Sequence, residues 1–432
     1  MKTAMKTSTR ATFIAWVSML VAVVPAHAHY RKLTPVVVFP AFHLTILEVK
    51  VQNQSVFPEC PASGKFEDWY LNPNPNPQFT QVCKDKLLTL VYKPASSKPM
   101  AERFYNQPGV EVKLKQYGST ESAPFYKPLY KFLEAAGYKS NVNIRVAGYD
   151  SRLTPDMDNF LIRTKRLIEQ TYYQNKNTPV HLVAHSNGPF YAQYLLTHTT
   201  QAWKNKFIHG FTPIAGNWPG QGLLYPVYFT GLNVIDFSFP KDPANAASSA
   251  AMYQTHPSSY MSSSDPAVFG NREVVVRTVQ GGKTYTPQDY QQLFQDAGLS
   301  LAQQLAPFYI GFVKFAPPFF PNVDVYAEKG SGLDTIVGAQ LQNLSLGQVL
   351  NDSTVFFKRD GDSNQEDITN DAIAVWAKMP CYRFVLTDNP SVGHFDLPSN
   401  PAVLQRLLAN LQQTKSVCPF PSDYYVPGKS PN

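Results

Sequence analysis

The chain has 432 residues, of which 44% are hydrophobic and 16% are charged, and its formal net charge is +7. This composition excludes a wholly disordered chain, and the length allows one large α/β domain with insertions or two ordinary domains. The basic residues are dispersed and form no run like a nucleic-acid-binding arm, so we expect no nucleic-acid partner and at most a weak attraction to an anionic membrane surface.

The first predicted element is a cleavable secretory signal over residues 1–28. Lys2, Lys6 and Arg10 precede an apolar run at 11–24, and the triplet Ala-His-Ala that follows fits the small-x-small rule for signal-peptide cleavage. The alternative is an N-terminal anchor helix, but the run is shorter than the roughly 20 residues that a membrane-spanning helix needs. Removing the signal takes away three basic residues and no acidic one, which leaves a formal net charge of +4.

Short β-branched runs recur along the rest of the chain and predict buried strands. They occupy residues 35–39, 143–147, 180–184, 208–214, 323–326, 354–357 and 382–386. Helical patterns lie between several of them, as at 156–174, where the residues of one face recur every three or four positions. Strands that alternate with helices predict a parallel sheet.

Two regions interrupt this rhythm. Residues 48–117 contain NPNPNP at 72–77 and two of the cysteines, which predicts a loop-rich insertion with its own disulfide clip. Residues 217–320 contain KDPANAASSAAMYQTHPSSYMSSSDP, which is too polar and too broken for a core and predicts a mobile lid, with a disordered surface loop as the alternative. We place the α/β domain at 29–418 and an extended tail at 419–432.

Four cysteines form an even set in a chain that we expect to enter an oxidising compartment, which predicts two disulfides. Sequence proximity favours Cys60 with Cys83 and Cys381 with Cys418 among the three possible pairings. No C-x-x-C motif is present, and we expect no metal and no other cofactor. Three N-x-S sequons are glycosylation candidates if they lie at the surface on a eukaryotic secretory route: Asn53, Asn343 and Asn351.

Ser186 lies where the apolar run of PVHLVAHSNGPFYAQYLL ends and a helical pattern begins. The small residues Ala184 and Gly188 flank it and allow the tight turn that lifts a nucleophilic serine above a sheet edge. The alternative is a serine that caps an ordinary turn between a strand and a helix. Because this nucleophile elbow is typical of the α/β-hydrolase fold, we predict that fold with a mostly parallel central sheet.

A serine nucleophile needs a base, and the base needs an acid that orients it. His394, in NPSVGHFDLPSN, follows the last predicted strand and precedes a helical pattern at 401–411, so its loop belongs at the carboxyl end of the sheet. Its alternative role is that of a satisfied surface or core histidine. Asp362, after the flexible Gly361, is the predicted acid, and Asp360 is the second choice.

Acyl transfer also requires stabilisation of an oxyanion, usually by the amide after the nucleophile and by one in a loop after an early strand. Asn187 provides the first backbone amide, and Phe42 in FPAFHLT provides the second. We interpret His43 and His185 as structural neighbours of the site.

Longer stretches resemble the lecithin:cholesterol acyltransferase family, which includes a lysosomal phospholipase that also transfers acyl groups. Within residues 34–411 they are VVVFPAFHLT, AGYDSRLTP, HLVAHSNGPFYAQYLL, QAWKNKFIHGFTPIAGNWPG, and DGDS followed by VGHF. The resemblance implies that Ser186, Asp362 and His394 form the catalytic triad. It also implies that the insertion clipped by the first cysteine pair, with Trp69, is a cap that contacts membrane or acyl chain. In AGYDSRLTP, we predict that Asp150 and Arg152 form an ion pair that stabilises the end of a strand.

These observations predict a secreted or lysosome-like serine phospholipase or O-acyltransferase that works at a phospholipid membrane or lipoprotein-like surface. The serine would take a fatty acyl group from a phospholipid and pass it to a lipid alcohol or to water. One alternative is a secreted neutral lipase with the same triad. Another is a catalytically silent lipid-binding homologue, because Ala41 occupies the position of a glycine in the family's oxyanion loop.

Overall fold

The computed structural model describes residues 33–52, 57–58, 60–62, 64–69, 79–95, 97–234 and 238–418. The predicted secretory signal, the Asn53 sequon, the NPNPNP stretch and the predicted tail lie outside these residues. No helix among the described residues combines the length and the apolar character that crossing a bilayer requires.

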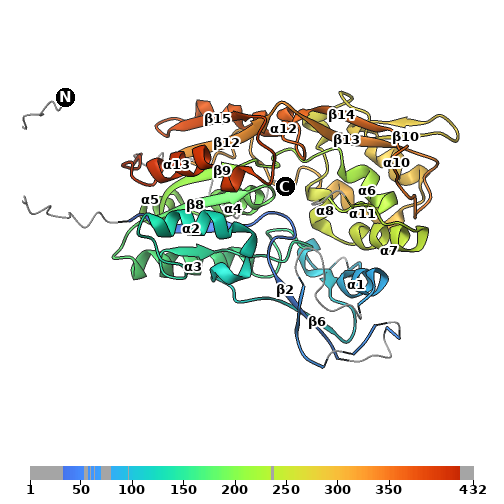
Figure 1. Cartoon of the computed structure of the whole chain (residues 1–432), viewed down its shortest axis with the longest axis horizontal. Helices are drawn as coiled ribbons and strands as arrows, with labels where there is room; N and C mark the ends of the chain where they lie inside the picture. The colour runs from blue at the N-terminus through green and yellow to red at the C-terminus, as the bar shows by residue number, and fades with distance from the viewer. Residues whose placement is uncertain are drawn as a thin grey trace, which may run out of the picture. The chain divides into compact units, whose positions relative to one another are not determined.

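A six-stranded parallel sheet forms the centre of the fold, with strand order β15-β12-β9-β8-β1-β7 (Figure 1). Every neighbouring pair in it runs parallel. Its strands are β1 (Val36–Phe39), β7 (Ile144–Val146), β8 (Val180–His185), β9 (Ile208–Ile214), β12 (Val325–Ser331) and β15 (Phe384–Pro390). All six residues of β8 are buried, as expected for a strand that is covered on both faces.

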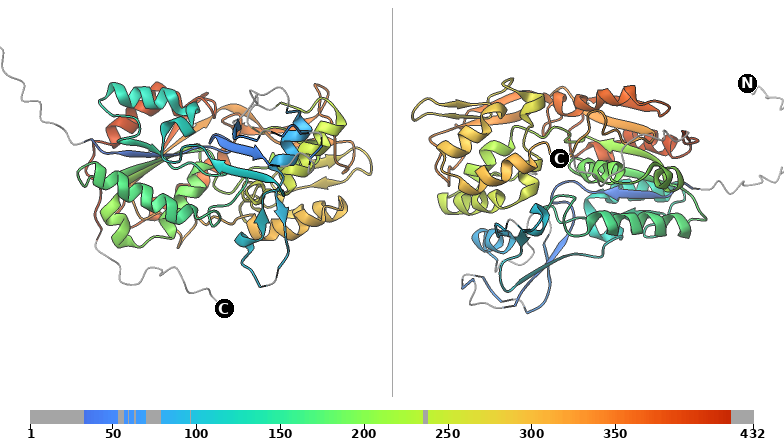
Figure 2. Two further views of the ribbon diagram at one scale, coloured as in Figure 1. Left: turned by 90° about the horizontal axis from the view of Figure 1, so that it is seen from below. Right: turned by 180° about the vertical axis from the view of Figure 1, so that it is seen from behind.

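Helices cover both faces of this sheet. Successive side chains of β1 point to opposite faces, so they belong to two different buried clusters. Val36 and Val38 belong to one buried cluster, with α2 (Lys127–Ala135) and α13 (Pro401–Asn410). Val37 and Phe39 belong to another, with residues of the helices on the opposite face, α3 (Phe160–Gln174), α4 (Gly188–Thr197) and α5 (Gln201–Phe207). The left view of Figure 2 shows the strands between these helix layers. This arrangement confirms the predicted α/β-hydrolase fold.

A second sheet, with strand order β11-β10-β13-β14, lies in the chain between β9 and β15. Its strands are β10 (Val276–Thr278), β11 (Thr284–Tyr285), β13 (Leu333–Leu341) and β14 (Phe356–Gly361). The helices of this region are α6 (Leu224–Thr230), α7 (Pro243–Gln254), α8 (Pro257–Met261), α9 (Pro266–Phe269), α10 (Tyr290–Asp296) and α11 (Ser300–Tyr309). The strand predicted at 354–357 is therefore β14, which pairs antiparallel with β13 outside the parallel sheet. A β-branched run predicts a strand but not the sheet that the strand joins.

The prediction that the serine-rich stretch at 241–266 is too polar for a core is wrong. Five of its serines are at most 1% exposed: Ser258, Ser259, Ser262, Ser263 and Ser264. Three of these hydroxyls, those of Ser258, Ser262 and Ser263, have hydrogen-bond partners; Ser263, for example, donates to the Ser259 carbonyl at 3.0 Å. The hydroxyls of Ser259 and Ser264 have none among the described residues. Large aromatic side chains of α6 and α8, including Tyr228 and Tyr260, stack in the same cluster.

The predicted insertion at 48–117 forms a small cap. Its antiparallel sheet has the order β3-β2-β6, from β2 (Leu47–Val51), β3 (Glu67–Trp69) and β6 (Val110–Leu114). It also contains α1 (Gln81–Leu88), β4 (Val91–Tyr92) and β5 (Phe104–Tyr105). A disulfide joins Cys60 to Cys83 of α1, and a second joins Cys381 to Cys418, so the structure contains both favoured pairs.

Candidate active site

Ser186 occupies a strained turn between β8 and α4. Its φ angle is 60°, a left-handed conformation that is uncommon for a residue with a side chain. Two hydrogen bonds hold the turn: the Ser186 amide donates to the Ile214 carbonyl at 3.0 Å, and the Ser186 carbonyl accepts from the Asn217 amide at 3.0 Å. The first residue of α4 is Gly188, and only glycine fits there, because a Cβ would lie 2.3 Å from the Phe39 carbonyl oxygen. This geometry is that of a nucleophile elbow.

Asp362 and His394 form a fully buried pair close to this elbow. Nδ1 of His394 lies 2.8 Å from Oδ2 of Asp362, and both side chains are 0% exposed. The other carboxylate oxygen of Asp362 accepts the amides of Asn364 and Gln365 at 3.0 and 2.6 Å. An ionised carboxylate only accepts hydrogen bonds, so the ring proton lies on Nδ1 and the lone pair on Nε2. That is the tautomer that a general base requires.

The hydrogen bond between the serine and the histidine is not formed in this structure. Within the described chain, neither Ser186 Oγ nor His394 Nε2 has a hydrogen-bond partner, and Nε2 is buried. The two loops are nevertheless adjacent, because Nε2 of His185, the residue before the serine, lies 3.0 Å from the His394 carbonyl oxygen. Catalytic hydrogen bonds are often open without substrate and tighten in the Michaelis complex.

The other two aspartates of the 354–367 stretch do not contact His394. Asp360 lies in β14 opposite Asp334 and is exposed. Asp367 begins the short helix α12 (Asp367–Asp371), 3.7 Å from Lys329, and burial raises its pKa to about 6. Of the three, only Asp362 is in place to orient the base.

The predicted oxyanion amides lie at the two loops that meet at the elbow. Phe42 follows β1, and its ring stacks on His43 with centroids 4.0 Å apart. The Asn187 side chain is held on both sides, since it donates to Ser262 Oγ at 2.7 Å and accepts from Asn217 Nδ2 at 2.9 Å. Neither the amide of Phe42 nor that of Asn187 donates to another described residue. Ser262 and Asn217 were not predicted; the only signal for Asn217 was its place in the GNWPG stretch.

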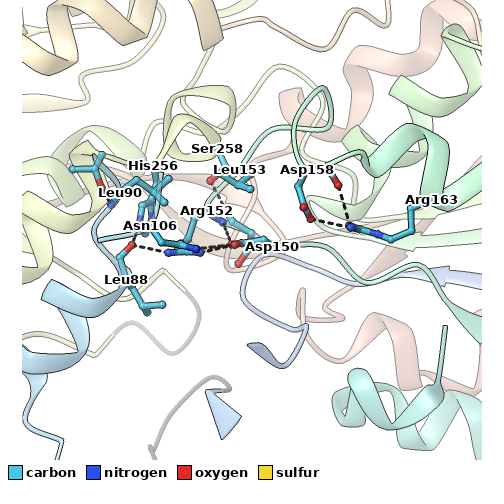
Figure 3. Close-up of polar contacts among 12 residues, drawn as sticks. Leu88, Leu90, Asn106, Asp150, Arg152, Leu153, Asp158, Arg163, His256 and Ser258 are labelled. Atoms are coloured by element: carbon cyan, nitrogen blue, oxygen red, sulfur yellow. Dashed lines mark hydrogen bonds and ion pairs between the residues drawn. The ribbon is translucent and has the colours of Figure 1, made fainter. Parts of the chain in front are cut away.

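The predicted pair of Asp150 and Arg152 is confirmed, with 2.6 Å between carboxylate and guanidinium and side chains 10% and 3% exposed. Burial would raise the pKa of Asp150, but the charge and hydrogen bonds of Arg152 outweigh it and lower that pKa. Figure 3 shows that Arg152 also reaches into the cap, where it donates to Asn106 Oδ1 at 2.9 Å and to the Leu88 carbonyl at 3.3 Å. His256, next to α8, donates to the same carbonyl at 3.0 Å. The pair therefore joins the cap to the hydrolase body.

A cavity of 540 Å³ lies between the cap and the α6–α7 region. Its lining includes His43, Trp69, Arg152 and Tyr253. Trp69 is 8% exposed and packs against Phe79, so its indole contacts the cavity rather than the outer surface. Burial lowers the pKa of His43 to about 4, which keeps this side chain uncharged near neutral pH. The predicted contact of Trp69 with an acyl chain or membrane stays a prediction.

Two sequons lie within the described residues. Asn351 is exposed and its side chain accepts from the Ser353 amide at 2.9 Å. Asn343 is half-buried and its amide donates to Gln280 at 3.3 Å. Asn351 is therefore the more accessible of the two predicted glycosylation sites.

Comparison with known proteins shows a partial match to one family. Residues 106–261 match the family model described as Lecithin:cholesterol acyltransferase. The match covers fewer than half of the residues, and over this stretch the chain resembles the family. The matched stretch contains the elbow and Ser186, whereas Phe42, Asp362 and His394 lie outside it.

Among the relatives of this chain, bovine (Bos taurus) lysosomal phospholipase A and acyltransferase is 31% identical over 52% of this chain and 56% of that protein. The rat (Rattus norvegicus) protein of the same name is 26% identical over 69% of this chain and 72% of its own length. Chicken (Gallus gallus) phosphatidylcholine-sterol acyltransferase is 27% identical over 55% of this chain and 57% of that protein. The chain thus spans little more than half of two of these three relatives.

A solved structure described as the crystal structure of the Tle4–Tli4 complex also resembles this chain. Its TM-score is 0.50 with 12% sequence identity, and the alignment covers 88% of this chain and 98% of that chain. A likeness at this level of identity supports the fold, in agreement with the parallel sheet described above.

Proposed function

We propose that this chain is a serine O-acyltransferase and phospholipase that takes a fatty acyl group from a phospholipid. The observation that carries the proposal is the buried Asp362–His394 pair beside an elbow that holds Ser186 in a left-handed turn. Similarity to proteins described as phospholipase A and acyltransferase and as phosphatidylcholine-sterol acyltransferase supports the substrate class.

In the proposed reaction, Ser186 Oγ attacks the ester carbonyl carbon while Nε2 of His394 takes the hydroxyl proton. The carbonyl oxygen becomes an oxyanion, which accepts from the amides of Phe42 and Asn187. When the C–O bond to the glycerol oxygen breaks, His394 returns the proton to that oxygen and lysophospholipid leaves. Asp362 keeps the imidazole in the correct tautomer throughout and stabilises its positive charge.

The acyl-enzyme then reacts with a second hydroxyl compound. The steps are those of acylation in reverse, with Ser186 Oγ as the leaving group. His394 removes the proton from water or from a lipid alcohol, the new oxygen attacks the acyl carbon, and Ser186 Oγ regains the proton as it leaves. Water gives a free fatty acid and an alcohol gives a new ester. Exclusion of water from the site would decide between the two outcomes.

We further propose that the protein works at a lipid surface on the secretory route, in the extracellular space or in a lysosome-like compartment. The two disulfides support an oxidising environment, and two of the relatives reported above are named as lysosomal. For the lipid that accepts the acyl group, we propose only its chemical class, a lipid alcohol.

Mass spectrometry of lipid products tests the proposed function. Purified protein and its Ser186→Ala variant are incubated with phosphatidylcholine vesicles that contain sterol. Sterol ester or free fatty acid, formed with lysolipid and absent in the variant, is the expected result. Hydrolysis of triacylglycerol but not of phospholipid would indicate a neutral lipase instead, and a folded protein that an active-site serine probe does not label would indicate a silent lipid-binding protein.

A further inference from the structure

We propose that His185 is a positioning residue for the catalytic site, which acts through Tyr126 to hold the oxyanion loop and the His394 loop in register. The inference rests on the proposed function, because it assigns a role within that site. His185 immediately precedes the nucleophile, and neither it nor Tyr126 belongs to the proposed triad.

A continuous chain of three hydrogen bonds joins the two loops. The amide of Ala41 donates to the Tyr126 hydroxyl at 2.8 Å. That hydroxyl lies 3.0 Å from Nδ1 of His185, and Nε2 of His185 lies 3.0 Å from the carbonyl oxygen of His394. All four residues are at most 1% exposed, so no solvent competes for these groups.

The donors and acceptors along this chain agree with one proton arrangement. A carbonyl oxygen only accepts, so Nε2 of His185 carries the proton and Nδ1 is left as an acceptor for the Tyr126 hydroxyl. The hydroxyl oxygen in turn accepts from Ala41. Burial, and then repulsion from His394, lowers the pKa of His185 below its ordinary value, which maintains the neutral ring that this arrangement requires.

The positions of the end points give the chain its consequence for catalysis. Ala41 immediately precedes Phe42, whose amide is proposed to bind the oxyanion. At the other end, the backbone of His394 is held from two sides, since its amide donates to the Asp362 carbonyl at 2.7 Å and its carbonyl accepts from His185. Asp362 therefore fixes the base to the acid loop, and His185 fixes it to the elbow. A small displacement of either loop would misplace reacting groups, and a displacement of about 1 Å costs up to about a hundredfold in rate.

Packing alone is the competing explanation, because Phe125 stacks on the His185 ring at 6.2 Å with an interplanar angle of 3°. The test therefore removes a hydroxyl without removing a ring. Tyr126→Phe breaks the chain, and Tyr130→Phe is the matched control, since its buried hydroxyl donates to the Ala123 carbonyl at 3.1 Å outside the chain. Hydrolysis of p-nitrophenyl butyrate is measured for both, together with thermal unfolding.

We expect Tyr126→Phe to lower kcat by about tenfold to a hundredfold with KM changed less than about twofold. Tyr130→Phe is expected to keep kcat within about twofold while losing a similar amount of thermal stability. Equal kcat values for the two variants would overturn the proposal, because a packing role lowers stability in both without a selective loss of kcat.

Variants of His185 test the two halves of the link separately. His185→Asn keeps an acceptor near Nδ1, His185→Gln keeps a donor near Nε2, and His185→Leu keeps neither. We expect the lowest kcat for His185→Leu, intermediate values for the other two, and no further loss when Tyr126→Phe is added to His185→Leu. Fully additive losses of kcat would contradict a single continuous chain of hydrogen bonds.

The ester assay separates failure of this inference from failure of the proposed function. Wild-type activity that is lost in Ser186→Ala but unchanged in Tyr126→Phe overturns the positioning role alone. Wild-type protein that is no more active than Ser186→Ala overturns the serine mechanism, and the positioning role with it.

Discussion

Asp362 contacts His394 through its side chain and its backbone at the same time. Its Oδ2 lies 2.8 Å from Nδ1 of the ring, and its carbonyl oxygen accepts the His394 amide at 2.7 Å. The side-chain contact selects the tautomer, and the backbone contact sets the place of the loop. The two contacts have different sensitivities to mutation, because a side-chain substitution removes only the first.

Asp362→Asn should therefore leave the loop in place and still remove activity. The asparagine side chain is close to that of the aspartate in shape but lacks the charge that stabilises the imidazolium. It also allows the wrong tautomer of the His394 ring. We expect kcat to fall by at least about a hundredfold, with little change in thermal unfolding. Asp360→Asn is the matched control and should keep activity within about twofold. A larger loss in the control than in Asp362→Asn would reverse the assignment of the acid.

Stability should depend on pH through the buried carboxyl pair of Glu273 and Glu366, which are 3% and 5% exposed. Burial raises the pKa of both above their ordinary value of 4.5, and repulsion within the pair raises that of Glu273 further, while Arg359 acts in the opposite direction. The folded protein therefore binds protons more tightly than the unfolded chain. This contribution to stability is complete below pH 4.5 and is lost as the pH rises through the raised folded values.

Glu366→Gln tests this pH dependence, because it mimics the protonated form. We expect the variant to unfold at a higher temperature than the wild type at pH 8 and to show no such gain at pH 4. Glu121→Gln, at an exposed position, is the control and should show no pH-dependent difference. A gain of the same size at both pH values would contradict the titration as its cause.

Removing Arg152 should weaken the junction between the cap and the body. Arg152→Met leaves the Asp150 carboxylate buried without its partner, which costs about 3 to 5 kcal/mol. The free energy of unfolding in denaturant measures this loss, and Arg163→Met, at the more exposed pair with Asp158, should cost less than about 1 kcal/mol. If Asp150→Asn combined with Arg152→Met recovers none of the loss, the unpaired charge is not its cause.

Each disulfide should contribute to stability according to the loop that it closes. The separations are 23 residues for Cys60–Cys83 and 37 for Cys381–Cys418, so paired serine substitutions should each cost about 2 to 4 kcal/mol of unfolding free energy. Peptide mapping without reduction checks the two pairings. Loss of the first pair should lower protection of α1 from hydrogen exchange, whereas loss of the second should leave α1 unchanged.

Several features could be predicted because their causes are local. The small residues around Ser186, the β-branched runs of β1, β8 and β9, and the helical spacing of α3 each follow from neighbours in the sequence. The family resemblance was predicted from stretches of this kind and is confirmed. The catalytic role of Ser186 stays a prediction, because a strained turn is compatible with catalysis without demonstrating it.

Other features could not be predicted because they depend on contacts between distant residues. The serine-rich stretch at 241–266 has a polar composition, and only its partners in the folded chain make burial possible. The strand at 354–357 had the pattern of a buried strand, yet it pairs with β13 outside the parallel sheet. His185 had the sequence context of a structural neighbour, and its contacts lie 59 and 209 residues away.

The sequence by itself determined the class of fold, the family resemblance and the residue types that meet at the elbow, since strand and helix periodicity and turn chemistry act over a few residues. The tertiary structure decided which aspartate faces His394, how the cap is joined to the body and which buried polar groups find partners. The physical reason is that burial of a polar group costs free energy unless its hydrogen-bond partner is buried beside it. Only the folded chain brings such partners together from distant parts of the sequence.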